Sequence, residues 1–439
     1  MTAPIAIPVS APSRAPGVPG MPSTVPPTSV PVGFLLAAGI GLSVAGLATW
    51  FAADRIVHSP THPGAVSAVH VTVLTFLTTA VLGALHQFAP VIGQRPLRSV
   101  RAARVTLVGM VATGWLLPTG FAHGPSWLVP TGGLIGAATV SLAIWNLSAP
   151  LASAAGGLPA RGLRIALAYL ALTVAFGVVY AFDRETGWFP LLPHRVLAHA
   201  HLGLLGWLGL TYASVAEKLW PMFLLAHRPS DRAGRTAVTL LSVGPVVLAG
   251  GLLLAVPPLA WLGGVLAAGG LLAHLSSLAS CVRHRHRPLE LLHAYLFVSA
   301  AFLVAGMALA LAAGVADLST TARASVVAAE VAALLAWIGL AVVGHAHKIV
   351  PFIGYTALRA RGIRSGPSGT PLLFADLFHR GTARVTLVVG TAGFASVVGG
   401  ILARSPGLVA AGGVAVTVTG VLATVNLGLG PRRVTRRTP

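Results

Sequence analysis

Histidine is the residue that brings the most chemistry to this strongly apolar chain, which contains 16 histidines in 439 residues. Neutral imidazole is the commonest transition-metal ligand in proteins and a frequent axial ligand of haem iron. His70, His199 and His201 each lie near the start of a long apolar segment, which would surround a flat cofactor with low polarity. These three residues are the candidate cofactor ligands, and haem is the expected cofactor.

His199 and His201 are two residues apart, and side chains with this spacing point about 200° apart around an α-helix. We therefore expect them to serve two different sites rather than to chelate one metal. One would face the helix bundle, and the other would reach a copper site near the outer loops. Candidate partners at that metal site are His58, His62 and His194. The alternative is a loop region with scattered, solvated histidines.

A second set of polar residues lies near the other ends of the same segments. The 16 residues from His70 to His86 span about 24 Å of helix, so one ligand cannot bridge both levels. We therefore expect a separate inner polar layer that anchors helices, moves protons or contacts a haem propionate. Its candidate members are His86, Glu217, Lys218, His345, His347 and Lys348. Glu217 is the best proton-relay candidate, whereas the two lysines also suit helix ends that reach the headgroups.

The elements that position these residues must be membrane-spanning helices. The chain is 55% hydrophobic and only 9% charged, which is too apolar for a soluble protein of this length. Twelve apolar runs reach about 20 residues, the length that crosses a hydrocarbon core of ~30 Å, and lipid requires them to be helical. The sequence predicts an all-α polytopic membrane protein with these spans: Val32–Ala53, Val66–Ile92, Arg104–Phe121, Leu128–Ser148, Leu163–Phe182, Leu197–Leu225, Thr236–Val256, Leu259–Val282, Leu289–Val315, Ser325–Val350, Val385–Ala403 and Leu408–Leu429.

Three regions follow from this reading. Residues 1–31 are rich in Pro, Ser and Thr and are predicted to be disordered, residues 32–430 form the transmembrane domain, and residues 431–439 form a basic tail. The single cysteine, Cys281, cannot form an internal disulfide or a cysteine-based cluster.

Positive charge is concentrated on one side of the predicted bundle. The loops after the second, fourth, sixth, eighth and tenth spans, with the C-terminal tail, carry 21 arginines, and the opposite loops carry five. We call these the Arg-rich and Arg-poor faces. The asymmetry follows the positive-inside rule for a bacterial inner-membrane protein with both termini in the cytoplasm. The net charge of +20 therefore reflects topology in a lipid bilayer, and a nucleic-acid partner is not expected.

The chain also repeats itself. The stretch "HVTVLTFLTTAVLGALHQFAPVI" from His70 aligns with "HLGLLGWLGLTYASVAEKLWPMF" from His201 at an offset of 131 residues. A further shift of 130 residues brings in "VAALLAWIGLAVVGHAHKIVPFI", which places Lys348 under Lys218 and Trp337 under Trp207. The second, sixth and tenth spans are thus versions of one helix, and the twelve spans divide into three pseudo-repeats of four.

Twelve spans in three groups, with histidines at the outer ends of central helices, resemble the catalytic subunit of haem–copper oxidases and nitric-oxide reductases. The stretches "HAHLGLLGWLGL" (199–210) and "GHAHKIVPFIGY" (344–355), with the one from His70, are similar to short, divergent bacterial members. The resemblance implies that His70 is an axial haem ligand and that His201 or His199 binds copper. It also implies a respiratory electron donor or partner subunits.

The chain departs from that family at the copper site. The seventh span has no pair of adjacent histidines, and the outer end of the tenth span reads "AAEVAALL", with Glu330 as its only ionisable residue. A complete centre for reducing oxygen or nitric oxide is therefore not expected, and enzymatic activity stays open. The leading hypothesis is a haem-binding protein in electron transfer or in handling or sensing a small gas. The alternatives are a transporter or channel that uses the same polar layers, and an oxidase accessory or haem-delivery protein.

Overall fold

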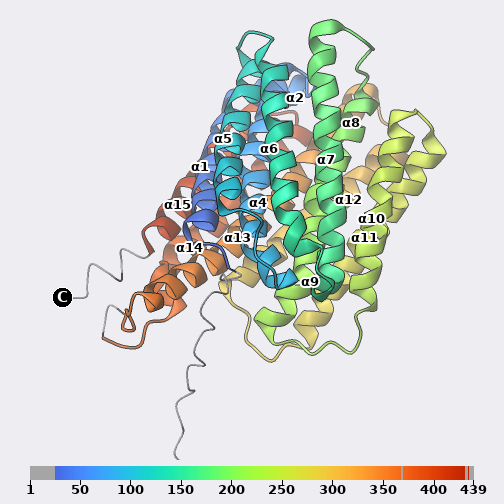
Figure 1. Cartoon of the computed structure of the whole chain (residues 1–439). Coiled ribbons are helices and arrows are strands. Elements are labelled where there is room, and N and C mark those ends of the chain that lie inside the picture. The colour runs from blue at the N-terminus through green and yellow to red at the C-terminus, as the bar shows by residue number, and fades with distance from the viewer. Residues whose placement is uncertain (1–24, 367–368, 431–433, 435–439) are drawn as a thin grey trace, which may run out of the picture.

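The computed structural model describes residues 25–366, 369–430 and 434. Most of the predicted N-terminal tail and of the basic tail at 431–439 therefore lies outside the described residues. Within them, twelve helices are long and apolar enough to cross a membrane, which confirms an all-α polytopic membrane protein (Figure 1). The helical domain begins at Ser29, three residues before the predicted boundary.

Ten spans are single α-helices, and two are composite. The single ones are α1 (Ser29–Phe51), α5 (Val100–Ala122), α6 (Leu128–Leu151), α7 (Gly157–Thr186), α10 (Arg232–Leu253), α11 (Pro257–Arg283), α12 (Leu291–Val315), α13 (Thr320–Ala360), α14 (Arg380–Leu402) and α15 (Pro406–Gly428). The second span joins α3 (Pro63–His70), a π-helical segment (Val71–Thr78) and α4 (Thr79–Gly93). The sixth joins α8 (Pro193–His201), a π-helical segment (Leu202–Gly209) and α9 (Leu210–Leu224). Short helices lie at Ala53–His58 (α2), Ala154–Gly156 and Phe374–Leu377.

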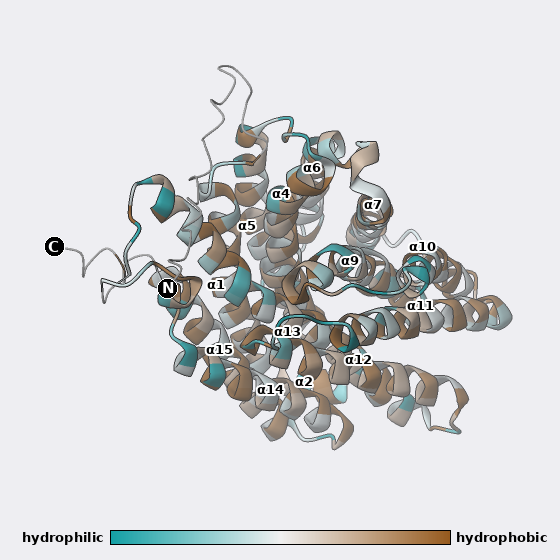
Figure 2. Ribbon diagram, turned by 90° about the horizontal axis from the view of Figure 1, so that it is seen from below, coloured by the Kyte–Doolittle hydropathy of each residue, from teal (hydrophilic) through white to brown (hydrophobic). Residues whose placement is uncertain are grey.

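The spans form three repeats of four: repeat 1 from α1 to α6, repeat 2 from α7 to α11, and repeat 3 from α12 to α15. Seen from the Arg-rich face, α4, α9 and α13 lie inside, between α5–α7 on one side and α12, α14 and α15 on the other (Figure 2). Repeat 1 meets repeat 2 through α6 and α7, and repeat 3 closes onto repeat 1 through α15 and α1. The described residues show no comparable contact between α11 and α12, where repeat 2 meets repeat 3.

Aromatic side chains from all three repeats interlock in the middle of the membrane. Phe76, Trp207 and Trp337 hold equivalent positions, and each is almost completely buried. Each ring packs against the preceding repeat, at the residue that follows that repeat's own aromatic residue by two positions. The three contacts are Phe76 on Gly339, Trp337 on Gly209, and Trp207 on Thr78, where the indole nitrogen lies 3.4 Å from the hydroxyl oxygen. We call these six residues the pinwheel, because every contact runs in the same direction around the bundle.

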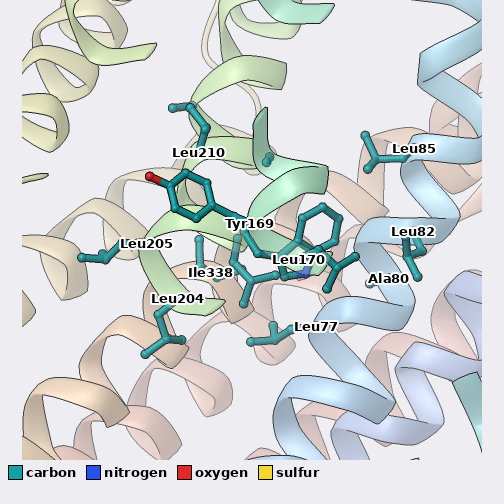
Figure 3. Close-up of a cluster of buried hydrophobic side chains, with 14 of the residues drawn as sticks. Leu77, Ala80, Leu82, Leu85, Tyr169, Leu170, Leu204, Leu205, Leu210 and Ile338 are labelled. Carbon is teal, nitrogen blue, oxygen red and sulfur yellow. The ribbon is translucent and has the colours of Figure 1, made fainter. Parts of the chain in front are cut away.

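The pinwheel is surrounded by close-packed aliphatic side chains. Leu77 from the second span, Leu170 from α7, Leu205 from the sixth span and Ile338 from α13 meet in one buried cluster (Figure 3). Burial of this kind separates the outer and inner halves of the bundle, so the polar residues of the two halves form separate sites.

A second contact also repeats. The Asn146 side chain accepts a hydrogen bond from the Ser99 amide (2.9 Å) and donates one to the Ser99 carbonyl (3.0 Å). Asn426 clamps His379 in the same way, at 2.8 and 3.1 Å, and both partners lie 280 residues later. Each clamp satisfies backbone groups at the start of a span, which would otherwise be unpaired. These clamps support the threefold repeat through contacts that the sequence alignment did not use.

The π-helical segments change the register of the repeats. They follow directly after His70 and His201, whereas α13 is α-helical throughout. A π-turn accommodates one extra residue. His199 accordingly precedes its pinwheel tryptophan by eight residues, and Glu330 precedes Trp337 by seven. Once the extra residue is counted, Glu330 is the counterpart of His199.

Candidate functional site

The side chains of His70 and His199 lie next to each other in the half of the bundle nearer the Arg-poor face. Their ring centroids are 6.4 Å apart, and the ring planes differ by only 18°. His70 ends α3 in repeat 1, and His199 belongs to α8 in repeat 2. The pair thus joins the two repeats at their boundary.

The two helices that carry this pair are held apart. α3 packs on α1, α2 and α5, whereas α8 packs on α7 and α10, and the described residues show no comparable contact between α3 and α8. Nδ1 of His70 lies 2.8 Å from the Val66 carbonyl oxygen, so that Nδ1–H can donate and Nε2 is left as the basic nitrogen. Nδ1 of His199 is buried and makes no hydrogen bond. The pair therefore includes one buried nitrogen, Nδ1 of His199, that the protein does not satisfy.

His201 takes part in a different contact. Its Nε2 lies 3.3 Å from Oε1 of Glu330 on α13, and its Nδ1 lies 2.8 Å from the Leu197 carbonyl oxygen. Both side chains are largely buried, with exposed fractions of 12% for His201 and 7% for Glu330. His199 and His201 contact different neighbours, as their two-residue spacing requires. The expected pairing of His70 with His201 is corrected, because His199 is the histidine beside His70 and His201 is bound to Glu330.

These two pairs occupy equivalent positions in the threefold arrangement. His70 and His201 are counterparts, and so are His199 and Glu330. The boundary between repeats 1 and 2 therefore carries a His–His pair where the next boundary carries a His–Glu pair. At the third boundary the corresponding residues are Ala332 and Ala68, which have no polar side-chain atoms.

Aromatic rings and arginines surround the His–His pair on its outer side. The Phe121 ring lies 5.2 Å from His70, and the guanidinium of Arg184 lies 5.5 Å above Phe121. The Tyr180 ring lies 5.9 Å from His199, and its hydroxyl donates to the backbone carbonyl of Arg195. The Arg184 guanidinium thus lies one ring away from the pair, whereas that of Arg195 lies over Phe189, two rings away. The sequence analysis did not identify these neighbours, because they come from segments distant in the chain.

The outer histidines expected at a copper site are not brought together. His58 contacts Asp54 of its own helix, with Nδ1 3.1 Å from the carboxylate, and the His62 ring accepts the Gly64 amide at the start of α3. His194 lies in the first turn of α8. Over residues 25–366, 369–430 and 434, no group of three or more His, Cys, Asp or Glu is positioned to hold a metal ion.

The inner polar residues do not form one layer either. His86 stacks on Phe34 within repeat 1, with centroids 5.2 Å apart, and His347 stacks on Tyr295 within repeat 3 at 5.4 Å. In both histidines Nδ1 faces a backbone carbonyl four residues earlier, and Nε2 is buried without a partner. The equivalent positions therefore point into separate four-helix units rather than toward a shared axis, which corrects the expected common layer.

Glu217, at the equivalent position of repeat 2, forms a buried ion pair. It accepts hydrogen bonds from Arg228 (2.8 Å) and Ser277 (2.6 Å). Burial disfavours the charged form of Arg228, but the hydrogen bond and charge of Glu217 outweigh it and raise the pKa of Arg228. Ser277 holds the position that Asn146 holds in repeat 1, so this ion pair replaces the asparagine clamp. Glu217 is thus engaged in a structural contact.

The two lysines reach the Arg-rich face in different ways. Lys348 binds the Glu290 carboxylate at 2.6 Å, whereas Lys218 is exposed. Both positions agree with lysines that extend from helix ends toward the headgroups.

His345 belongs to a separate aromatic cluster between repeats 2 and 3. Tyr212 lies between two histidines, with centroid distances of 5.9 Å to His345 and 5.2 Å to His274. His345 and His347 therefore face different neighbours, as their two-residue spacing requires.

Comparison with known proteins gives no relative for this chain: neither a family model nor a curated protein matches it.

Proposed function

We propose that this protein holds one haem between His70 and His199 and serves in electron transfer within the membrane. The observation that carries the proposal is that two nearly parallel imidazoles from different repeats have ring centroids 6.4 Å apart. Metal–nitrogen bonds are about 2 Å long, so His70 and His199 would be close enough to hold one haem iron between them. The residues present fit this cofactor.

The neighbouring residues support the same assignment. The Val66 carbonyl orients the His70 ring and leaves Nε2 for the metal, as backbone acceptors commonly do for ligand histidines. Arg184 lies where it would attract a propionate from the Arg-poor face, and Phe121 and Tyr180 pack against the imidazoles. A π-helical segment directly follows His70, and such segments are common at functional sites.

When bound, haem supplies a one-electron redox couple. His70 and His199 would both hold the iron, and neither side chain would be free to handle a bound gas. This favours electron transfer over gas reduction, and the absence of a three-ligand group among the described residues gives copper no comparable support. Likeness to haem–copper oxidase catalytic subunits is therefore proposed for the haem and the threefold helix arrangement, and not for a binuclear centre.

A transporter or channel receives less support. A route along the pseudo-threefold axis would have to pass the pinwheel, where Phe76, Trp207 and Trp337 are buried in contact with the next repeat. The arginine distribution supports a bacterial cytoplasmic membrane with the Arg-rich face inside, which places the proposed haem near the periplasmic side.

Visible spectroscopy of the purified protein tests the proposal. We expect a Soret band and the spectrum of a six-coordinate haem, with about one haem per chain by pyridine haemochrome. His70→Ala and His199→Ala should abolish or greatly reduce the band. His201→Ala and His86→Ala are matched controls, since both remove a buried histidine outside the pair and should keep it. Absence of haem from protein expressed with ample haem supply, or retention of the full spectrum in His199→Ala, would refute the assignment.

A further inference from the structure

An apolar cleft lies where repeat 3 closes onto repeat 1, in the half of the bundle nearer the Arg-rich face. It is lined by α1, α13 and α15, and Phe76 and Ala80 of the second span form its deep end. Thr424 is its only polar lining residue, and the hydroxyl oxygen of this threonine is buried without a partner. Lining residues such as Leu35 and Gly39 are partly exposed, so the cleft opens on the lipid-facing surface.

The equivalent place between repeats 2 and 3 is filled. Val342 and Val350 in the cleft correspond to Tyr212 and Trp220, at the offset of 130 residues that relates α13 to the sixth span. Ala423 corresponds to His274, a completely buried side chain. Small residues thus line the cleft where the boundary between repeats 2 and 3 has two aromatic rings and an imidazole.

The dimensions of the cleft match one half of a bilayer. Along α1 its lining runs from Val32, near the Arg-rich face, to Leu42, near the level of the pinwheel. These ten residues of helix span about 15 Å, which is half of a hydrocarbon core of roughly 30 Å. The cleft is thus an elongated apolar slot perpendicular to the membrane plane.

From this geometry we propose that the cleft binds one acyl chain of a phospholipid from the leaflet at the Arg-rich face. An apolar slot open to hydrocarbon takes a hydrocarbon chain, and its length fits a chain that enters from the headgroup level and ends at Phe76. The Val32 end of the cleft lies toward the Arg-rich face, whose positive charge is complementary to a phosphodiester headgroup. The bound chain would cover the boundary between repeats 3 and 1, and its binding does not depend on haem.

Photolabelling tests this without any variant. Full-length protein in nanodiscs made with a phospholipid carrying a diazirine on one acyl chain should be labelled at peptides lining the cleft, including Val350 and Ala423. The same experiment with a diazirine-bearing isoprenoid quinone is the comparison. Labelling of the cleft by the phospholipid supports the proposal. Labelling by the quinone alone, or phospholipid labelling spread evenly over lipid-facing helices, would overturn it.

A filled cleft provides the second measurement. Val342→Tyr with Val350→Trp introduces the residues of the closed boundary and should lower acyl-chain labelling at least about tenfold, the cost of excluding two methylene groups. Native mass spectrometry should show the loss of one retained phospholipid. Val388→Tyr, on a lipid-facing site of α14 that is 67% exposed, is the matched control and should label like the parent. Equal labelling of the filled variant and the parent, with both monodisperse, contradicts the proposal.

Discussion

The His70–His199 pair and the His201–Glu330 pair occupy the same position at successive repeat boundaries, yet they differ in chemistry. In the first pair the two ring centroids are 6.4 Å apart, and Nδ1 of His199 has no partner. In the second pair Nε2 of the imidazole lies 3.3 Å from a carboxylate oxygen, within contact distance. The difference lies in one residue, because His199 corresponds to Glu330. A repeated scaffold has thus produced one open position suited to a ligand and one position closed by an internal ion pair.

The largest effect is expected from converting the closed pair into the open one. Glu330→His would place a second His–His pair between repeats 2 and 3, and we expect bound haem to rise from about one toward two per chain. Haem-to-protein stoichiometry measures this. The control is Glu330→Gln, which removes the charge without adding an imidazole and should leave the stoichiometry unchanged. Unaltered stoichiometry in Glu330→His would mean that the separation of α3 and α8, rather than the ligand pair, decides where haem binds.

The pinwheel holds both pairs at the same depth, so its loss should destabilise the framework they share. Trp207→Ala removes a buried indole at the membrane centre, and we expect a decrease of about 3–5 kcal/mol in the free energy of unfolding. Denaturant unfolding in detergent measures it. Trp145→Ala, at a lipid-facing site that is 49% exposed, should cost far less. Equal losses for the two variants would contradict a close-packed centre.

A smaller effect is expected on stability: the two pairs should differ in how much the loss of one member lowers the unfolding free energy. Glu330→Ala leaves the largely buried His201 without its partner, and we expect a loss of about 1–3 kcal/mol in unfolding free energy. His70→Ala in haem-free protein breaks no ion pair and should cost less than Glu330→Ala. Thermal unfolding of the haem-free variants distinguishes them, and a larger loss in His70→Ala would reverse the comparison.

The smallest effects are expected at the inner lysines, far from either pair. Lys218→Gln should change the unfolding free energy by less than about 0.5 kcal/mol, since the side chain is exposed. Lys348→Gln loses a partly exposed bridge to Glu290, which is worth about 0–1 kcal/mol. Haem content should stay unchanged in both. A change in haem content in Lys218→Gln would contradict the separation of the two halves of the bundle.

Hydropathy and repeat alignment were sufficient for the twelve spans and their grouping, because the length of an apolar run and its spacing are properties of the chain alone. They also predicted that His199 and His201 serve different sites, since this follows from helix geometry. Which side chains pair across helices could not be predicted from the sequence in the same way. Whether His70 faces His199 or His201 depends on how two helices are rotated, and a gapless alignment does not reveal the extra residue of a π-turn. Glu330 was therefore not recognised as the counterpart of His199.

The side-chain positions differ from the remaining site predictions for a related reason. A common depth along the helices suggested one inner layer, but His86 and His347 point into their own four-helix units. The proposed copper ligands His58 and His62 are close in sequence to the outer end of α3, yet each ring is used by a local backbone or side-chain contact. Local partners of this kind arise from loop conformation, which composition does not specify.

The π-helical segments also make the three repeats unequal. Repeats 1 and 2 share an extra residue at the same place, and repeat 3 lacks it. In this helix the first two repeats are therefore more alike than either is to the third. The same reasoning makes Val71–Thr78 and Leu202–Gly209 the stretches where deleting one residue would leave both ends of a membrane helix in phase.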